Sequence, residues 1–312
     1  MKVSVAMVTY NHEAFIAKAL DSILMQMTDF DFEIVIGEDC SIDNTRSILI
    51  DYSNRHPDRF KLLLNENNLG MFKNGLQVLE ACTGKYIAIL EGDDYWTSAD
   101  KLQKQADFLD AHPESVICFH NAIMHYIDKS HEDHTYCNSN QKEFSTAEDL
   151  LKYGNFIPSC SKMYRKEFFE VPDWISSLKM GDWPCDILLA RYGNIAYINE
   201  VMGVYVIHNS GAWYPLRQNW EEGNKANLEA YNRLYDFLDY KYKKIIKRII
   251  HDKHLLAAER YEDMDEINNA KLYAAKSITD HYVISIPSVI MIFRLYFPVI
   301  FKFVKSLRHA CS

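Results

Sequence analysis

The first 120 residues alternate short apolar runs with amphipathic segments, and this alternation constrains the fold more than any other feature of the chain. Each apolar run has five or six residues, the length of a buried strand. Between the runs, apolar residues recur at helical spacing; Ile16, Leu20 and Ile23, for example, share one face of 15–27. The predicted strands are 3–8, 33–37, 60–64, 85–90 and 116–120. Strands joined by helices form βαβ crossovers, so the sequence predicts an α/β fold with a mostly parallel sheet flanked by helices.

Beyond residue 120 the pattern loosens and then becomes almost wholly helical. We expect two further strands, over 195–199 and 203–208, and a helix that starts at Asp182. A capping box at Ser145 is expected to open another helix. The chain is therefore predicted to have three parts: an α/β domain over 1–215, a helical extension over 216–282, and a basic amphipathic tail over 283–312.

Charge is distributed unevenly along the chain. The net charge is −9, yet residues 241–312 carry 13 Lys and Arg against 7 Asp and Glu, so the first 240 residues carry −15. An acidic body of this kind argues against a nucleic-acid partner, which needs a basic face. The seven cysteines form no C-x-x-C pair and no secretory signal precedes the first strand. We therefore expect a reduced, cytoplasmic location.

The tail has the composition of a segment that lies on a membrane surface. No carboxylate follows Asp280, while Arg294 and three later cations give the tail a charge of +4. Pro287 and Pro298 interrupt its apolar stretch, which disfavours a spanning helix. We expect this helix to lie on the inner face of the cell membrane, with its cations toward anionic headgroups. Packing of the tail on the core, or on a second subunit in a homodimer, is the alternative.

Acidic residues gather where predicted strands end. Glu38 and Asp39 follow one strand, and Glu91, Asp93 and Asp94 follow a strand as apolar as 86–90. Ligands of open α/β sheets bind beyond the carboxyl ends of the strands, so these groups should converge. Like charges crowded together repel unless a cation intervenes, and Mg²⁺ or Mn²⁺ suits carboxylates plus a substrate phosphate. The alternative for Glu38 is a helix cap or a solvated position.

Four segments together resemble family 2 glycosyltransferases, which are inverting, nucleotide-sugar-dependent enzymes with the GT-A fold. The segments are 4–11 (SVAMVTYN), 38–45 (EDCSIDNT), 68–74 (NLGMFKN) and 84–94 (GKYIAILEGDD). The resemblance covers roughly 1–215. A dinucleotide-dependent oxidoreductase is disfavoured, because the turn after the first strand holds no Gly-x-Gly. A catalytically silent sugar- or nucleotide-binding protein of the same fold is the remaining alternative.

The resemblance implies a set of substrate-binding residues around a nucleotide-sugar donor, and it implies that this donor is a UDP-sugar. Asp39 would accept a hydrogen bond from the base, and Asp93 would ligate the metal. Glu38, Lys73 and Glu91 depart from the family pattern, in which Asp, Arg and Asp are usual. The implied substrate-binding residues are Tyr10, Asn11, Asp39, Asn68, Lys73, Asn74, Glu91 and Asp94.

Two later residues complete the implied site. Asp182 matches the family's catalytic base, and a helix N-terminus stabilises the ionised carboxylate there; a plain N-cap is the alternative, and Asp186 is the substitute base. His208 would complete the metal's coordination, unless it is structural. The chain lacks the Gln-x-x-Arg-Trp element of processive synthases. We therefore expect transfer of one sugar to a glycan or lipid-linked acceptor, as in surface polysaccharide synthesis.

Overall fold

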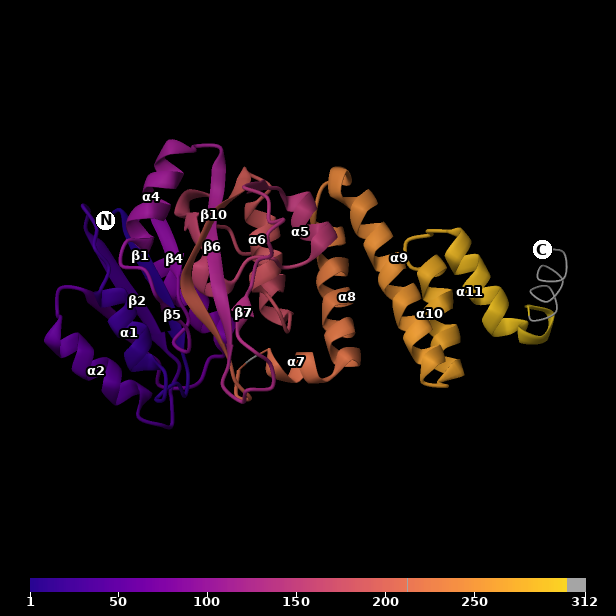
Figure 1. The fold of residues 1–312 in the computed structure, drawn as a ribbon, viewed down its shortest axis with the longest axis horizontal. Coiled ribbons are helices and arrows are strands. Elements are labelled where there is room, and N and C mark those ends of the chain that lie inside the picture. The colour runs from indigo at the N-terminus through magenta and orange to yellow at the C-terminus, as the bar shows by residue number, and fades with distance from the viewer. Residues whose placement is uncertain (212, 302–312) are drawn as a thin grey trace. The chain divides into compact units, whose positions relative to one another are not determined.

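A computed structural model of the protein describes residues 1–211 and 213–301. The chain forms two compact units, Met1–Pro215 and Leu216–Ser312 (Figure 1). Three cations that the sequence predicts to face a membrane, Lys302, Lys305 and Arg308, lie outside the described residues.

The first unit is built on one mixed sheet. Its strands are β1 (Val3–Thr9), β2 (Phe32–Glu38), β3 (Phe60–Leu64), β4 (Tyr86–Ile89), β5 (Tyr95–Trp96), β6 (Ser115–Tyr126), β7 (His134–Thr135), β8 (Phe144–Ser145), β9 (Met163–Arg165) and β10 (Asn194–Ile207). Their order is β3-β2-β1-β4-β9-β6-β10-β5, with β7 on β6 and β8 on β10. The first four strands in this order run parallel, as do β6 and β10. β9 runs antiparallel to both of its neighbours.

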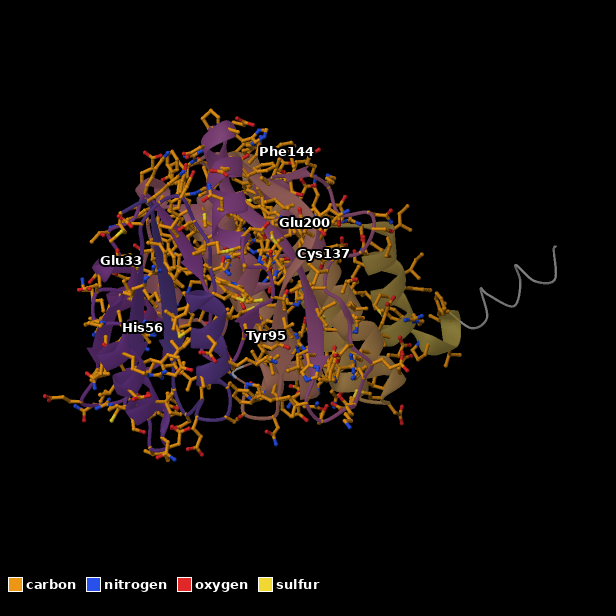
Figure 2. All side chains as sticks on the ribbon, turned by 60° about the vertical axis from the view of Figure 1, so that its left-hand side comes forward. Glu33, His56, Tyr95, Cys137, Phe144 and Glu200 are labelled. Carbon is orange, nitrogen blue, oxygen red and sulfur yellow. The ribbon has the colours of Figure 1, made fainter. Side chains whose placement is uncertain are left out.

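Helices cover both faces of this sheet. They are α1 (Ile16–Leu24), α2 (Thr45–Arg55), α3 (Met71–Ala81), α4 (Lys101–Ala111), α5 (Ala147–Tyr153) and α6 (Asp182–Leu189), with short 3₁₀ turns η1 (Ser159–Ser161), η2 (Lys166–Phe168) and η3 (Asp173–Ser177). Alternate residues of β1 point to opposite faces. Val5 and Met7 enter the core that also contains Leu20 of α1 and Leu102 of α4, while α3 packs against β1 and β2. In Figure 2, Glu33 and His56 mark the β2 and α2 side of this unit, and Phe144 and Glu200 mark the β8 and β10 side.

Two local predictions are wrong. β10 is one strand of 14 residues rather than two strands, because its ladder with β6 continues past register shifts on both sides of Val201. The cap of α5 is Thr146 rather than Ser145: Asp149 N–H donates to Thr146 Oγ1, and Thr146 N–H donates to Asp149 Oδ2. The sequence had placed both features within a few residues of their positions.

The second unit is helical. Its helices are α8 (Trp220–Phe237), α9 (Tyr240–Asp263), α10 (Ile267–Thr279) and α11 (Ile286–Tyr296), and α7 (Tyr214–Gln218) precedes them across the boundary between the units. α9 packs against α8 and α10, and α11 packs against α10. Leu234, Ile246, Ile250 and Ala274 are among the buried residues that hold these helices together.

α11 buries only one side. Met291 and Leu295 are buried, whereas Val289, Ile290 and Phe297 are about half exposed. The Arg294 guanidinium, which the sequence analysis placed toward headgroups, instead forms an ion pair with Glu262 of α9. Within 1–211 and 213–301, none of the helices has both the length and the apolar composition needed to cross a bilayer.

Candidate active site

The loops after β1 and β2 form the first wall of the site, and hydrogen bonds join them tightly. Asn11 N–H donates to Ser41 Oγ (2.9 Å), and Ile42 N–H donates back to Asn11 Oδ1 (2.9 Å). Asn11 has a φ of 55°, a left-handed conformation that asparagine tolerates better than most residues. Tyr10, which precedes it, keeps 41% of its surface exposed. The two residues expected to border a nucleoside therefore stand on a braced edge of the sheet.

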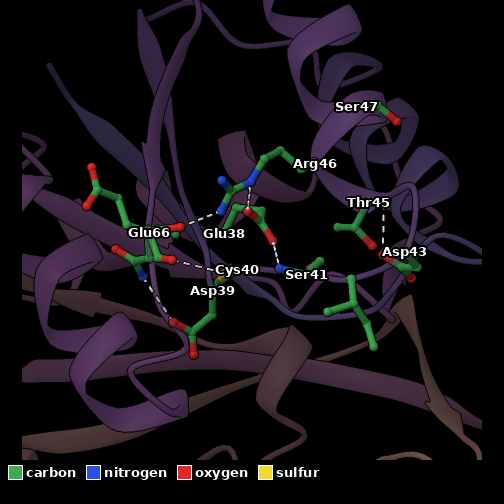
Figure 3. A network of polar contacts seen from close by, with 12 residues as sticks. Glu38, Asp39, Cys40, Ser41, Asp43, Thr45, Arg46, Ser47 and Glu66 are labelled. Atoms are coloured by element: carbon green, nitrogen blue, oxygen red, sulfur yellow. Dashed lines mark hydrogen bonds and ion pairs between the residues drawn. The ribbon is translucent and has the colours of Figure 1, made fainter.

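Asp39 is buried in the next loop and gathers three donors. Leu69 N–H and Asn65 Nδ2 donate to Oδ1 (2.8 and 3.1 Å), and Gly70 N–H donates to Oδ2 (2.9 Å). Figure 3 shows this carboxylate beside Glu38 and Cys40. Asp39 thus fixes the chain just before α3, while its carboxylate oxygens keep further lone pairs as acceptors.

Glu38 has a different role from a solvated or capping residue. Its side chain is fully buried; Ser41 N–H donates to Oε1 (2.6 Å), and Arg46 of α2 pairs with Oε2 (Figure 3). Arg46 also donates to the carbonyl oxygen of Asn65. Glu38, which replaces the Asp usual in the family, therefore has the Arg46 guanidinium as its ion-pair partner. Sequence reasoning missed Arg46 and Asn65, because neither stands at a motif position.

The segment before α3 and the first turn of α3 carry the remaining residues of this half of the site. Gly70 N–H donates to Asn68 Oδ1 (3.0 Å). Asn74 is buried and donates to the Gly37 carbonyl oxygen (2.8 Å), and a Cβ on Gly37 would lie 2.2 Å from Asn74 Oδ1. Lys73 is exposed on α3. Asn74 therefore fastens α3 to β2, while Lys73 is free to reach toward solvent.

The turn after β4 brings Asp93 against two histidines. His208 Nε2, at the end of β10, lies 3.0 Å from Asp93 Oδ2, and His12 Nε2 lies 3.7 Å from the same oxygen. A Cβ on Gly92 would come within 2.6 Å of Thr9 Oγ1 and 2.8 Å of His12 Nδ1, so glycine permits this approach. The structure brings Asp93 and His208 together. His12 was missed, since one histidine in a loop has no distinguishing spacing.

The three acids of this turn differ in charge state. Burial acts to raise the pKa of Asp93, but the hydrogen bond from His208 and the charges of His12 and His208 lower it overall. Burial and the adjacent Asp93 raise the pKa of Glu91 to about 7, and Glu91 Oε2 has no hydrogen-bond partner within the described chain. Asp93 is therefore the acid of this turn whose ionised form is favoured, and an unpaired carboxylate oxygen of Glu91 lies two residues away.

Asp94 lies on the inner side of the same turn. Its side chain is 2% exposed, and Val206 N–H of β10 donates to its Oδ1 (2.7 Å). Burial, followed by the charges of Asp93 and Glu91, raises its pKa well above the ordinary value. Asp94 therefore ties the turn to β10 from a buried position, which lacks the open access expected of a substrate contact.

The arrangement of Asp93 and His208 fits a cation that is also bound by phosphate groups of a substrate. In the described ranges, no group of three or more His, Cys, Asp or Glu side chains is arranged to hold a metal alone. A cation bridged to phosphates needs fewer protein ligands, because the phosphates supply the others. Asp93 and His208 offer one carboxylate and one imidazole, a donor set that suits Mn²⁺ and, less well, Mg²⁺. The orphan oxygen of Glu91 is a further acceptor for a metal-bound water or a hydroxyl.

Asp182 begins α6 with half of its carboxylate unused. Asn155 Nδ2 lies 3.2 Å from Asp182 Oδ2, and Oδ1 has no hydrogen-bond partner among described residues. The charge of Asp182 contributes to raising the pKa of Glu91, so the two carboxylates are within electrostatic reach. Asp186, the substitute base, is fully buried and ion-paired with Lys162 (2.9 Å). That pairing leaves Asp182 as the better placed of the two.

Comparison with known proteins gives consistent matches. The family model described as Glycosyl transferase family 2 matches residues 4–171. An uncharacterized protein of Mycobacterium tuberculosis is 36% identical over 236 residues, which cover 73% of this chain and 67% of that protein. The poly(ribitol-phosphate) beta-N-acetylglucosaminyltransferase TarS of Staphylococcus aureus is 33% identical over 120 residues, or 38% of this chain and 20% of TarS.

Solved structures share the architecture. The crystal structure of S. aureus TarS 1–349 in complex with UDP has a TM-score of 0.56 at 19% identity, covering 90% of this chain and 92% of that one. The mannosyltransferase PcManGT from Pyrobaculum calidifontis, in complex with GDP-Man and Mn²⁺, has a TM-score of 0.59 at 17% identity, covering 95% and 81%. At these identities the likeness establishes the fold.

Proposed function

Since this chain belongs to glycosyl transferase family 2 and has the GT-A fold that its sequence predicted, we propose that it transfers one sugar from a nucleotide-sugar to a hydroxyl acceptor, with inversion and with a divalent metal. Its identity as a glycosyltransferase follows from the family. One observation carries the finer proposal: Glu91, two residues before the Asp93 that contacts His208, lies within electrostatic reach of the half-unpaired carboxylate of Asp182.

The donor's nucleoside is proposed to bind between the loops after β1 and β2 and the start of α3. Tyr10 and Asn11 border this space, and Asp39 offers acceptor lone pairs to the base. Asn68 and Lys73 follow at the start of α3, where Lys73 can reach a phosphate as a point charge. A UDP-sugar is the donor proposed, in line with the family resemblance and with the UDP bound by TarS.

The metal is proposed to be Mn²⁺ or Mg²⁺, held by Asp93 and His208. PcManGT, which shares the fold, was crystallised with Mn²⁺ and a nucleotide-sugar. When bound, such an ion would offset the negative charge that develops on the departing diphosphate. The chain's own residues keep Asp93 ionised and keep His208 facing it. The His208 ring is oriented by a hydrogen bond of 2.7 Å between its Nδ1 and Ser210 Oγ.

Asp182 is proposed as the general base. Its free Oδ1 would accept the proton of the acceptor hydroxyl during attack, while Asn155 holds Oδ2. Because the acceptor attacks in one displacement from the face opposite the departing diphosphate, the configuration at the anomeric carbon inverts. Lys162 keeps Asp186 occupied, so a second carboxylate one turn away does not compete for that proton.

The acceptor is proposed to be a glycan or lipid-linked glycan of a surface polysaccharide, used at the inner face of the cell membrane. TarS is named for transfer to poly(ribitol-phosphate), which places one relative in polymer glycosylation. The exposed apolar residues of α11 and the carboxylate-free sequence after Asp280 favour contact with lipid.

A panel of nucleotide-sugars with Mn²⁺ or Mg²⁺ tests the proposal, with thermal shift reporting donor binding and donor hydrolysis reporting turnover. Asp93→Asn should abolish the metal-dependent thermal shift. Asp182→Asn should keep the shift and lose transfer by a factor of about 10²–10⁴. Asp173→Asn, on the exposed surface of the same unit, is the matched control. Full turnover by Asp182→Asn would refute the base, and donor binding that ignores metal in both wild type and Asp93→Asn would refute the metal site.

A further inference from the structure

The helical unit exposes large apolar side chains at the start of α9 and in the connection between α10 and α11. Tyr240, at the start of α9, is 88% exposed. In and just after the connection between α10 and α11, Tyr282, Ile284 and Ile286 are 90%, 72% and 78% exposed. Single exposed apolar residues are common on protein surfaces, whereas a group of them marks an interaction surface.

A cationic stripe of α9 lies against this connection. The centre of the His281 ring lies 4.1 Å from the centre of the Tyr235 ring of α8. Lys243 Nζ and Lys247 Nζ lie 5.1 and 5.6 Å from the centre of that same Tyr235 ring. Tyr235 therefore joins the lysines and the apolar connection into one continuous surface. In the described part of the chain, neither lysine has a carboxylate within ion-pair distance.

The charge of this surface is positive. Five cations occupy the first turns of α9: Lys241, Lys243, Lys244, Lys247 and Arg248. The nearby acids are Asp236, Asp239, Asp280 and Asp252, of which Asp252 forms an ion pair with Arg248, so five cations against four acids leave a surplus of one positive charge. No acid follows Asp280. Cations beside exposed tyrosine and isoleucine have the composition of a surface that binds anionic lipid.

We propose that this surface of the helical unit, formed by Tyr240, Lys243, Lys247 and residues 282–286, is a docking site for an anionic lipid bilayer. The inference rests on the membrane location proposed above and assigns the contact to a surface other than the tail cations. Tyr282, Ile284 and Ile286 insert at the headgroup boundary, and Lys243 and Lys247 face the lipid phosphates. Arg294 takes no part, because Glu262 neutralises it.

Co-sedimentation of the full chain with sucrose-loaded vesicles tests the assignment. Vesicles of 30% phosphatidylglycerol in phosphatidylcholine should bind the protein, and pure phosphatidylcholine should bind it far less. Lys243→Gln with Lys247→Gln should weaken binding about 30-fold, since each lysine near an anionic surface contributes about fivefold. Tyr282→Ser with Ile284→Ser should weaken it at least tenfold. The control pair, Lys142→Gln with Lys152→Gln, removes the same charge from exposed positions of the first unit.

Several outcomes would overturn the proposal. Unchanged binding by both patch variants would do so, as would equal losses in the control pair. So would binding that disappears on removal of 302–312 while the lysine variant binds normally, because the tail would then carry the contact. The surface would instead be assigned to a second copy of the chain by two results together: the wild type does not bind vesicles, and sedimentation velocity shows a wild-type dimer that the patch variants lose. Donor hydrolysis, measured on the same preparations without lipid, separates failure of this proposal from failure of the proposed reaction.

Discussion

Lys101 allows a quantitative test of the core near the candidate active site, because its amine is buried and has no hydrogen-bond partner among the described residues. Lys101 begins α4 and is fully buried, and its Nζ has no hydrogen-bond partner within the described residues. The Nζ atom of Lys101 lies 3.8 Å from the centre of the Trp96 ring. Trp96 follows the acidic turn, which holds Glu91, Asp93 and Asp94. Burial lowers the pKa of this amine from 10.5 to about 7, although the nearby thiols of Cys160 and Cys118 act in the opposite direction.

The pH dependence follows from that lowered pKa. The folded protein releases the Lys101 proton near pH 7, whereas the unfolded chain keeps it up to about pH 10.5. The unfolded state thus binds more protons between these values, so the free energy of unfolding rises with pH across this window. The gap corresponds to about 5 kcal/mol, at about 1.4 kcal/mol for each pH unit. Below pH 7 the whole cost opposes folding.

Urea denaturation of Lys101→Met and wild type, followed by tryptophan fluorescence at pH 7, 8 and 9, measures this effect. At pH 7 the variant should be more stable by up to about 5 kcal/mol, because methionine is a buried apolar replacement of similar length. By pH 9 that advantage should shrink by about 3 kcal/mol. Lys104→Met, three residues along the same helix and ion-paired with Glu200, is the control and should show no such trend. A stability difference that stays constant from pH 7 to 9 would refute the buried, titrating amine.

Three other changes give direct readouts. Arg46→Gln should destabilise the protein by about 3–5 kcal/mol in urea denaturation, because it leaves the buried Glu38 carboxylate unpaired; a loss below 1 kcal/mol would contradict the ion pair. Gly92→Ala should cost about 1–3 kcal/mol and weaken donor binding, since its Cβ would press on Thr9, whereas Gly75→Ala has ordinary contacts only and should be tolerated. Chelation with EDTA should remove the thermal shift produced by the donor, and added Mn²⁺ should restore it; a shift that survives chelation would argue against metal-dependent binding.

The fold was predictable because its signals are local and repeated. The strands β1, β2 and β3 are short runs rich in apolar residues, and each is followed directly by a helix. The error at β10 has a physical cause: the polar residues Asn199 and Glu200 look like a turn in sequence, but β6 holds the strand through the irregularity. The breaks in the helical unit, at Leu238–Asp239 and after Asp263, carry no Pro or Gly and left no local signal.

Residues of the candidate site could be predicted only where they belong to a sequence motif. Asp93 and His208 are 115 residues apart and were brought together by resemblance, not by spacing. His12, Arg46 and Asn65 act through contacts that the tertiary fold creates, so no pattern in the chain marks them. Lys101 is the clearest case, because a lysine at the start of a helix usually faces water.

The fold gives the three carboxylates of the acidic turn different environments, and this difference supports the metal site that we propose at Asp93. Three ionised acids within four residues would repel one another and open the turn. Burial raises the pKa of Asp94, and the backbone N–H of Val206 donates a hydrogen bond that holds its side chain in place. The two histidines, on loops after different strands, keep Asp93 ionised. One residue thereby anchors the turn to β10 while its neighbour supplies charge, and a cation at Asp93 would relieve the repulsion that remains with Glu91. The same division of charge therefore accounts for the turn as the structure shows it and supports the metal site that we propose there.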